Sequence, residues 1–226
     1  MKRKRLINQP MTYKAVIFDL DGTLLNTLHD IANPVNHVLS KYGYHTHSIT
    51  DMREYIGNGI GQLVYRALPA DVAESLHYKK ILEEVRVEYQ KHLNNSTVIY
   101  DGIGEVLSTL QARRISLNIL SNKSDEFMDE VHDTYFKEWD FDIVLGARIN
   151  KPLKPDPTSL LEIIDDLGLS ADECVFVGDS DVDMQTAVNA GVYAVGVTWG
   201  FRTQDVLRAS GADTIISQPD ELLNLF

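Results

Sequence analysis

The sequence predicts an α/β protein: a doubly wound, Rossmann-like parallel sheet with a small all-helical domain inserted after its first strand. Residues 15–18 form a continuous apolar run, which is typical of a strand buried on both faces of a parallel sheet. From residue 98 onward, strand-like runs alternate with helical patterns, an order that favours right-handed crossovers between parallel strands. Between these two regions apolar residues recur at helical spacing, and no convincing strand occurs.

The inserted region reads as a series of helices. They are expected at 26–41, from about Thr50, at 62–68 and at 72–93. Residues 22–26 and 94–97 have the composition of connecting segments. We therefore expect a flexible basic tail over residues 1–10, a core built from residues 11–25 and 96–226, and a helical domain over residues 26–95.

The second half of the chain supplies the remaining strands of the predicted sheet. These strands are expected at 115–120, 143–145, 174–177, 193–197 and 214–216. The helices that alternate with them are expected at 102–110, 125–136, 158–167, 181–190 and 206–209. Each helix then covers one face of the sheet, which completes the doubly wound arrangement.

Composition excludes several classes of partner. The 226 residues carry 21 Lys and Arg against 33 Asp and Glu, and a formal charge of −12 disfavours nucleic acid and anionic membranes. An anionic substrate would need a local positive site. The single cysteine, Cys174, lies in an apolar run and cannot form an internal disulfide, which fits a reducing compartment. With no apolar stretch long enough to span a bilayer, we expect a cytoplasmic protein.

Two aspartates follow the first strand. Asp19 and Asp21 lie at its carboxyl end, the edge where open α/β sheets bind their ligands. Neighbouring carboxylates repel each other, so such a pair is usually held by a cation. However, Asp21-Gly22 between apolar runs is also a strong signal for a hairpin turn. On its own, the stretch fits both a turn and an active site.

Three further polar stretches lie at strand ends in the second half of the chain. They are residues 121–123, 154–157 and 178–183. Because the carboxyl ends of parallel strands share one edge of the sheet, these side chains are expected to converge with the two aspartates. This convergence favours the active-site interpretation.

These four stretches resemble the motifs of the haloacid dehalogenase superfamily of phosphotransferases. Its motifs match residues 19–23, Ser121, Lys154 and 178–183, and the resemblance extends over the chain from about residue 11. It implies a helical cap between the first two motifs. Residues 56–59 and 198–201 look most like the phosphoglycolate phosphatase branch of that superfamily.

The residues of the four motifs suit phosphoryl transfer. Asp19 is the expected nucleophile, which forms an aspartyl-phosphate, and Asp21 is the expected acid/base group. We expect Mg²⁺ as the cofactor, with Asp19, Asp21 and Asp179 as its ligands, because Mg²⁺ prefers oxygen donors. For Asp21 the family resemblance implies that the backbone carbonyl is the ligand. Asp183 is expected to orient a metal-bound water or Lys154 from outside the first coordination sphere.

Polar donors for the phosphoryl group come from two stretches. Ser121 and Asn122 can donate to phosphate oxygens, although a serine at a strand end is also commonly a helix cap. Lys154 lies between prolines that fix the backbone, so its ammonium can be aimed at the phosphoryl group and the nucleophile. Lys151 is a rival for this role, and the motif match favours Lys154.

The inserted region is expected to contact the rest of the substrate. The backbone amides of Gly57, Asn58 and Gly59 can meet a substrate carboxylate, although the same residues suit a plain turn between helices. Arg53 is a second candidate for substrate binding. Both assignments depend on how the insert folds over the sheet.

The predicted function is therefore that of a Mg²⁺-dependent phosphatase acting on a small phosphorylated metabolite, similar to phosphoglycolate phosphatases. Alternatives within the superfamily are a pyrophosphatase, a sugar-phosphate or nucleotide phosphatase, and a phosphomutase. A non-catalytic regulatory protein that binds a phosphorylated metabolite is the alternative outside enzymes. The protein is expected to act as a monomer or homodimer.

Overall fold

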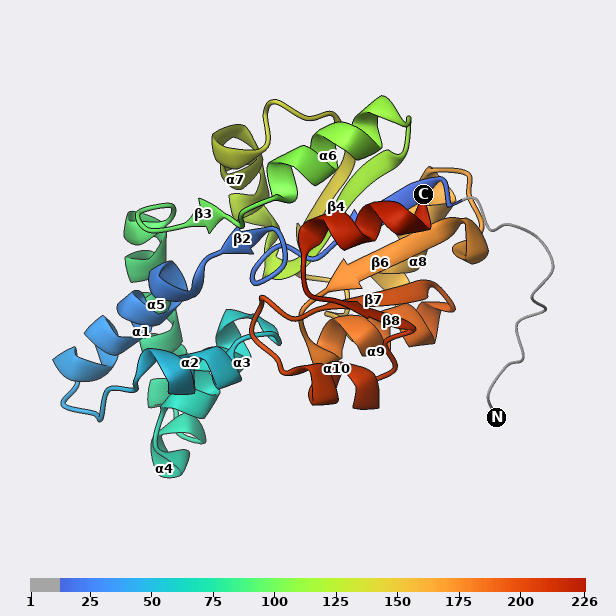
Figure 1. The fold of residues 1–226 in the computed structure, drawn as a ribbon. Coiled ribbons are helices and arrows are strands. Elements are labelled where there is room, and N and C mark those ends of the chain that lie inside the picture. Colours follow the sequence, from blue (N-terminus) through green and yellow to red (C-terminus); the bar gives the residue numbers. More distant parts are fainter. Residues whose placement is uncertain (1–12) are drawn as a thin grey trace.

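The chain folds around a six-stranded parallel sheet, as predicted. The computed structural model describes residues 13–226, so the predicted tail over residues 1–10 lies outside the described residues. The strands are adjacent in the order β5-β4-β1-β6-β7-β8 (Figure 1). Their bounds are Phe141–Ala147 for β5, Ser116–Ser124 for β4, Ala15–Phe18 for β1, Cys174–Gly178 for β6, Tyr193–Val197 for β7 and Thr214–Ile216 for β8.

Strand β1 lies at the centre because both of its faces are apolar. Val16 and Phe18 pack into one core cluster and Ala15 and Ile17 into another, and all four are at most 1% exposed. The two clusters lie on opposite faces because successive side chains of a strand alternate. The covering helices are α6 (Ile103–Ala112), α7 (Met128–Tyr135), α8 (Thr158–Asp166), α9 (Asp181–Ala190) and α10 (Gln204–Ala209), with 3₁₀ turns at Asp125–Phe127, Ala171–Glu173 and Pro219–Leu225.

The insert is helical (Figure 1). Its apolar side chains form one core cluster together with Phe127 and Phe201 of the sheet domain. Its helices are α1 (Leu28–Lys41), α2 (Ile49–Tyr55), α3 (Gly59–Ala67), α4 (Ala70–Ala73) and α5 (His77–His92). The single helix expected over 72–93 is wrong, because Ser75 interrupts it: its hydroxyl donates to Val72 O and accepts from His77 N. Helix α2 begins before Thr50, since Ser48 and Asp51 form a capping box there.

The two connections to the insert run side by side, which the sequence did not predict. Short strands β2 (Leu25–Asn26) and β3 (Val98–Ile99) pair antiparallel. The buried carboxylate of Asp30, on α1, accepts hydrogen bonds of 2.9 Å from the backbone N–H groups of Ser96 and Thr97. The Thr97 hydroxyl adds a bond of 2.7 Å to the same carboxylate. Asp30 therefore fixes the returning segment against the first helix of the insert.

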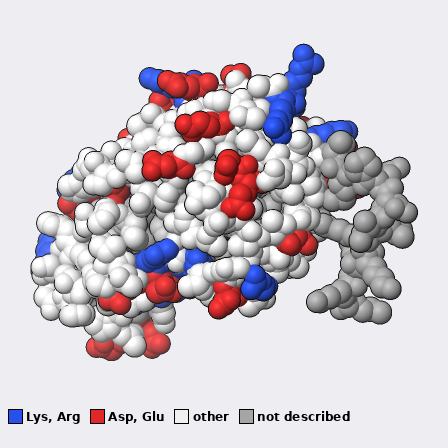
Figure 2. Space-filling view, viewed as in Figure 1, with Lys and Arg blue, Asp and Glu red and all other residues white. Residues whose placement is uncertain are grey.

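Acidic side chains are spread over the surface shown in Figure 2, and basic ones occur there in small groups. In the part of the chain that the structure describes, no helix is both long and apolar enough to cross a membrane.

Candidate active site

Seven of the eleven predicted site residues line a cavity between the carboxyl edge of the sheet and the insert. The cavity measures about 70 Å³, and since a water molecule needs about 10–15 Å³, it suits a small ligand. Its lining from the sheet side includes Asp19, Asp21, Ser121, Asn122, Lys123 and Lys154. The insert contributes Ile31, Ile56, Gly57, Gly59, Ile60, Leu63, Arg86 and Tyr89. Most of the polar side chains thus lie on the sheet side of the cavity, and the insert adds Arg86 and Tyr89.

Lys154 holds two of the aspartates. Its ammonium nitrogen Nζ lies 2.7 Å from Asp19 Oδ1, 2.7 Å from Asp183 Oδ1 and 3.0 Å from the carbonyl oxygen of Leu120. Burial alone would lower the pKa of Lys154, but Asp183 and Asp19 outweigh it and raise the pKa above its ordinary value. The ammonium is therefore charged. Its rival Lys151 instead pairs with Glu162, in an ion pair that leaves the Lys151 side chain 40% exposed.

Asn122 fixes the loop that carries Lys154. Its side-chain oxygen accepts from Lys154 N at 2.9 Å, and its amide nitrogen donates to Lys154 O and to Gly57 O, each at 3.0 Å. The amide therefore joins the lysine loop to the insert. Ser121 is buried, and its hydroxyl accepts from the backbone N–H of Lys123.

Three buried carboxylates form a cluster beside Lys154. Oxygen atoms of Asp19, Asp179 and Asp183 lie within 4.8 Å of one another. Burial, and then the charge of Asp183, raises the pKa of Asp179 to about 7. Burial and the same neighbour raise the pKa of Asp19 well above its ordinary value. The single ammonium of Lys154 thus lies beside the carboxyl groups of Asp19, Asp179 and Asp183, so one positive charge is set against three acidic groups.

This donor set fits Mg²⁺. The cluster offers only oxygen ligands, which a hard divalent cation prefers, and its excess negative charge is what such a cation would offset. Both oxygens of Asp183 already accept hydrogen bonds, from Lys154 and from Ser180. The side chain of Asp21 is not part of the cluster and turns to Lys123 instead.

Glycines allow the close approach around Asp179. A Cβ atom added to Gly22 would lie 2.3 Å from Asp179 Oδ2, and one added to Gly200 would lie 2.2 Å from Asp179 Cβ. Gly22 also has φ of +92°, which favours glycine. The Asp179 carboxylate accepts from Thr23 Oγ1 at 3.2 Å and from Phe201 N at 2.6 Å. The turn after β1 is therefore built around Asp179, which confirms the predicted turn and places it beside the acidic cluster; the active-site interpretation stays a prediction.

Sequence reasoning included Lys123 in a polar stretch at the edge of the sheet but gave it no role, and its side chain lines the cavity. Its Nζ lies 3.0 Å from Asp21 Oδ1 and also donates to the hydroxyl of Tyr89 on α5. Strand β4 continues through Ser124, beyond the end expected at residue 120, and residues two apart on a strand share a face. Lys123 is thus expected on the same side of β4 as Ser121.

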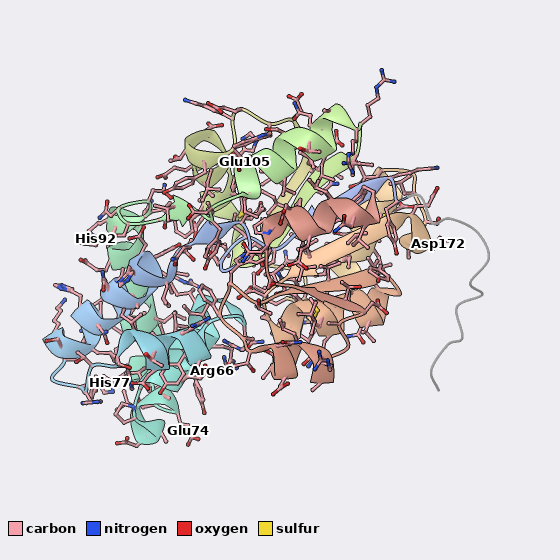
Figure 3. The ribbon with its side chains drawn as sticks, in the orientation of Figure 1. Arg66, Glu74, His77, His92, Glu105 and Asp172 are labelled. Atoms are coloured by element: carbon pink, nitrogen blue, oxygen red, sulfur yellow. The ribbon has the colours of Figure 1, made fainter. Side chains whose placement is uncertain are left out.

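The expected contacts of the insert divide into two groups. Gly57 and Gly59 line the cavity, whereas Asn58 and Arg53 are not among its lining residues. The Asn58 side chain accepts from Arg66, whose position on the insert Figure 3 labels. The cationic side chain that the insert brings to the cavity is Arg86, on α5.

Arg53 instead takes part in a junction between the insert and the core. It donates to the carbonyl of Gly200. In return, Arg202 donates to the carbonyls of Arg53 and Ile56, with Arg53 O at 2.8 Å, and to Asp181 of α9 at 3.3 Å. These exchanged bonds hold the end of α2, and with it Gly57, over the site.

Comparison with known proteins identifies the family. A model of the haloacid dehalogenase-like hydrolases matches residues 16–197. The chain belongs to this family. It is therefore a haloacid dehalogenase-like hydrolase, and the acidic cluster lies at the expected edge of its sheet.

Curated relatives in this hydrolase family include phosphoglycolate phosphatases. One from Pseudomonas syringae pv. tomato is 33% identical over 197 residues, which cover 83% of this chain and 70% of the relative. One from Vibrio parahaemolyticus is 29% identical over 94% of this chain and 95% of its own. The crystal structure of a predicted phosphoglycolate phosphatase from Haemophilus somnus has a TM-score of 0.87 at 27% identity, covering 94% of this chain and 97% of that one.

Proposed function

We propose that this hydrolase is a Mg²⁺-dependent phosphatase that uses Asp19 as its nucleophile and acts on a small phosphorylated acid, phosphoglycolate being the leading candidate. The observation that carries the proposal is the bond of 2.7 Å between Lys154 and Asp19 at the wall of a small cavity. A fixed ammonium at that place can stabilise both the nucleophile and the phosphoryl oxygens it approaches.

The proposed reaction has two steps, and it assigns one role to each side chain at the edge of the sheet. A carboxylate oxygen of Asp19 attacks phosphorus, the ester P–O bond breaks, and Asp21, which must carry a proton at this step, gives it to the leaving alkoxide and becomes a carboxylate. Asp21 then takes a proton from water, which attacks the phosphorus and breaks the bond to Asp19, releasing inorganic phosphate. Lys154 and the hydroxyl of Ser121 bind the non-bridging oxygens throughout.

Mg²⁺, held by Asp19 and Asp179 with the backbone carbonyl of Asp21, would offset the negative charge of the phosphoryl group as the carboxylate approaches. The raised pKa values of Asp19 and Asp179 support this assignment, because each carboxylate ionises more readily when a cation lies beside it.

Arg86 supports a substrate with a second anionic group. The insert side of the cavity is mainly apolar, and Arg86 is its cationic residue. The Arg86 guanidinium forms an ion pair of 3.8 Å with Glu83. A guanidinium binds a carboxylate through paired N–H donors. The names of the relatives point to the same class, since phosphoglycolate carries a carboxylate next to its phosphate ester.

A panel of phosphate esters assayed with Mg²⁺ or with EDTA tests the proposed function. We expect hydrolysis that needs Mg²⁺ and that falls by at least about 10³-fold in Asp19→Asn, in which the nucleophile is lost. Asp205→Asn, an exposed aspartate of α10, is the matched control and should keep full activity. Activity in Asp19→Asn equal to that of the wild type would overturn the mechanism.

A second assay tests the role of Arg86. In Arg86→Gln we expect KM for phosphoglycolate to rise about tenfold, since a charge-assisted hydrogen bond contributes ~1.5–3 kcal/mol. KM for ethyl phosphate, which lacks the carboxylate, should change little. Arg208→Gln, on the exposed side of α10, is the control. Hydrolysis restricted to pyrophosphate would show that Arg86 meets a second phosphate and would replace phosphoglycolate as substrate.

A further inference from the structure

Asp21, Lys123 and Tyr89 come from three different elements and meet at one point. Asp21 follows β1, Lys123 lies on β4 of the sheet, and Tyr89 lies on α5 of the insert. Lys123 Nζ is 3.0 Å from Oδ1 and 3.3 Å from Oδ2 of Asp21, and it also donates to the Tyr89 hydroxyl. We propose that Lys123 and Tyr89 are positioning residues for Asp21, and that they make its acid/base role depend on the insert lying closed over the sheet.

Burial makes this arrangement demanding for Lys123. Lys123 is 9% exposed and Tyr89 is 5% exposed, so both polar groups are largely shielded from bulk solvent. Burial lowers the pKa of the Lys123 ammonium, but Asp21 and Tyr89 outweigh this effect and raise the pKa overall. A buried charge without hydrogen-bond partners is strongly unfavourable, so the ammonium stays where both partners can reach it.

Lys123 fixes how the Asp21 carboxylate is turned. Because Nζ contacts both oxygens, rotation of the carboxylate about its last bond would lengthen at least one of the two contacts. Lys154 does not orient the Asp21 carboxylate, since its ammonium donates to Asp19 and Asp183. Proton transfer needs a carboxyl oxygen within hydrogen-bond reach of the leaving oxygen, so the orientation of Asp21 affects the rate directly.

Tyr89 connects this orientation to the insert. The Lys123 ammonium lies 5.1 Å from the centre of the Tyr89 ring, and the ring packs edge-on against Phe127 at 5.5 Å. Movement of α5 away from the sheet would remove the hydroxyl and the ring face from Lys123. The Lys123 ammonium would then form hydrogen bonds with incoming water in place of the Tyr89 hydroxyl. It could shift its position, and the Asp21 carboxylate would lose its fixed orientation. Asp21 is thus fully oriented only when the insert encloses the substrate.

This inference rests on the proposed function, and the choice of leaving group tests it separately. An alkyl phosphate releases a basic alkoxide that needs a proton from Asp21, whereas p-nitrophenyl phosphate releases a stable phenolate that does not. We expect Tyr89→Phe to lower kcat/KM about tenfold for the alkyl ester and less than twofold for the nitrophenyl ester. Lys123→Met should show the same selective loss at about 100-fold, within the range of ~10²–10⁴ that acid–base groups contribute.

Matched variants separate positioning from a general structural effect. Tyr78→Phe removes a hydroxyl from the same helix, one that donates to Gly61 O inside the insert, and should leave both rates unchanged. Lys151→Met removes an exposed lysine and should do the same. Lys123→Arg, which retains the charge, should restore part of the alkyl-ester rate. If Lys123→Met does not fold, as judged by thermal melting, Tyr89→Phe decides alone.

One outcome would refute the positioning role alone, and another would refute the proposed phosphatase function. An equal fall for both esters in Tyr89→Phe, or no fall for either, would refute the positioning role while the wild type remained an active phosphatase. A folded wild-type protein that hydrolyses neither ester would refute the proposed function itself.

Discussion

Asp179 is expected to make the stability of the metal-free protein fall as the pH rises. Its residue is 1% exposed, and burial, followed by the charge of Asp183, raises its pKa from 3.8 to about 7. Between these values the folded state retains a proton that the unfolded state releases. The stabilisation is therefore fully present below about pH 4 and is lost as the pH rises through about 7.

The size of this effect can be worked out from the pKa difference. About three pH units at ~1.4 kcal/mol each amount to about 4 kcal/mol of unfolding free energy, of which about 3 kcal/mol falls between pH 5 and pH 8. For a chain of this length that is roughly 6–12 °C in Tm. Mg²⁺ binds the ionised cluster of the folded state, so it should raise Tm much more at pH 8 than at pH 5.

Thermal melts at pH 5 and pH 8, with EDTA or with Mg²⁺, measure both effects. Asp179→Asn replaces the carboxylate with a neutral amide, so its metal-free Tm should depend less on pH and its response to Mg²⁺ should be lost. Asp205→Asn serves as the control. The reasoning is refuted if the difference in Tm between Asp179→Asn and the wild type is the same at both pH values.

Three further predictions concern the elements around the site. Asp30→Ala leaves the buried N–H of Thr97 and the part-buried N–H of Ser96 without their acceptor and should lower the unfolding free energy by about 3 kcal/mol in urea denaturation; an unchanged midpoint would contradict the role of this carboxylate. Gly22→Ala should reduce kcat at least tenfold, since its Cβ would meet the Asp179 carboxylate; Gly43→Ala, also at positive φ but with open space around it, separates this clash from backbone strain. Arg202→Gln should raise KM threefold to tenfold in steady-state assays through loss of the junction that holds α2, and an unaltered KM would argue against that junction.

Much of the core was predictable because each signal was local. The continuous apolar run of β1 indicated its burial, and the aspartates and the lysine that follow strand-like runs indicated one shared edge. The sheet then brings Asp19, Lys154 and Asp179 together, as the sequence analysis expected. Their catalytic and metal-binding roles remain predictions.

What could not be predicted depends on how the insert lies over the sheet. Arg86 and Tyr89 are two polar residues on an amphipathic helix, and no local pattern distinguishes the side chain that faces the cavity from one that faces solvent. Arg53 had the charge expected of a substrate ligand, yet it donates to a backbone carbonyl of the core. The ribbon of β2 and β3 was missed because each strand has only two residues.

That ribbon has a consequence for protein engineering. The chain leaves the core at Leu25 and returns at the paired Ile99, and partners in an antiparallel ladder lie about 4.5–5.5 Å apart. A different folded unit whose ends adjoin can therefore be spliced between these two residues without displacing β1 or its aspartates. The exchanged unit must also place a hydroxyl group beside Lys123, as Tyr89 does. A library of exchanged inserts would vary the wall of the cavity opposite the sheet, and an acceptor for the Asn122 amide in place of Gly57 O would keep the loop of Lys154 fixed.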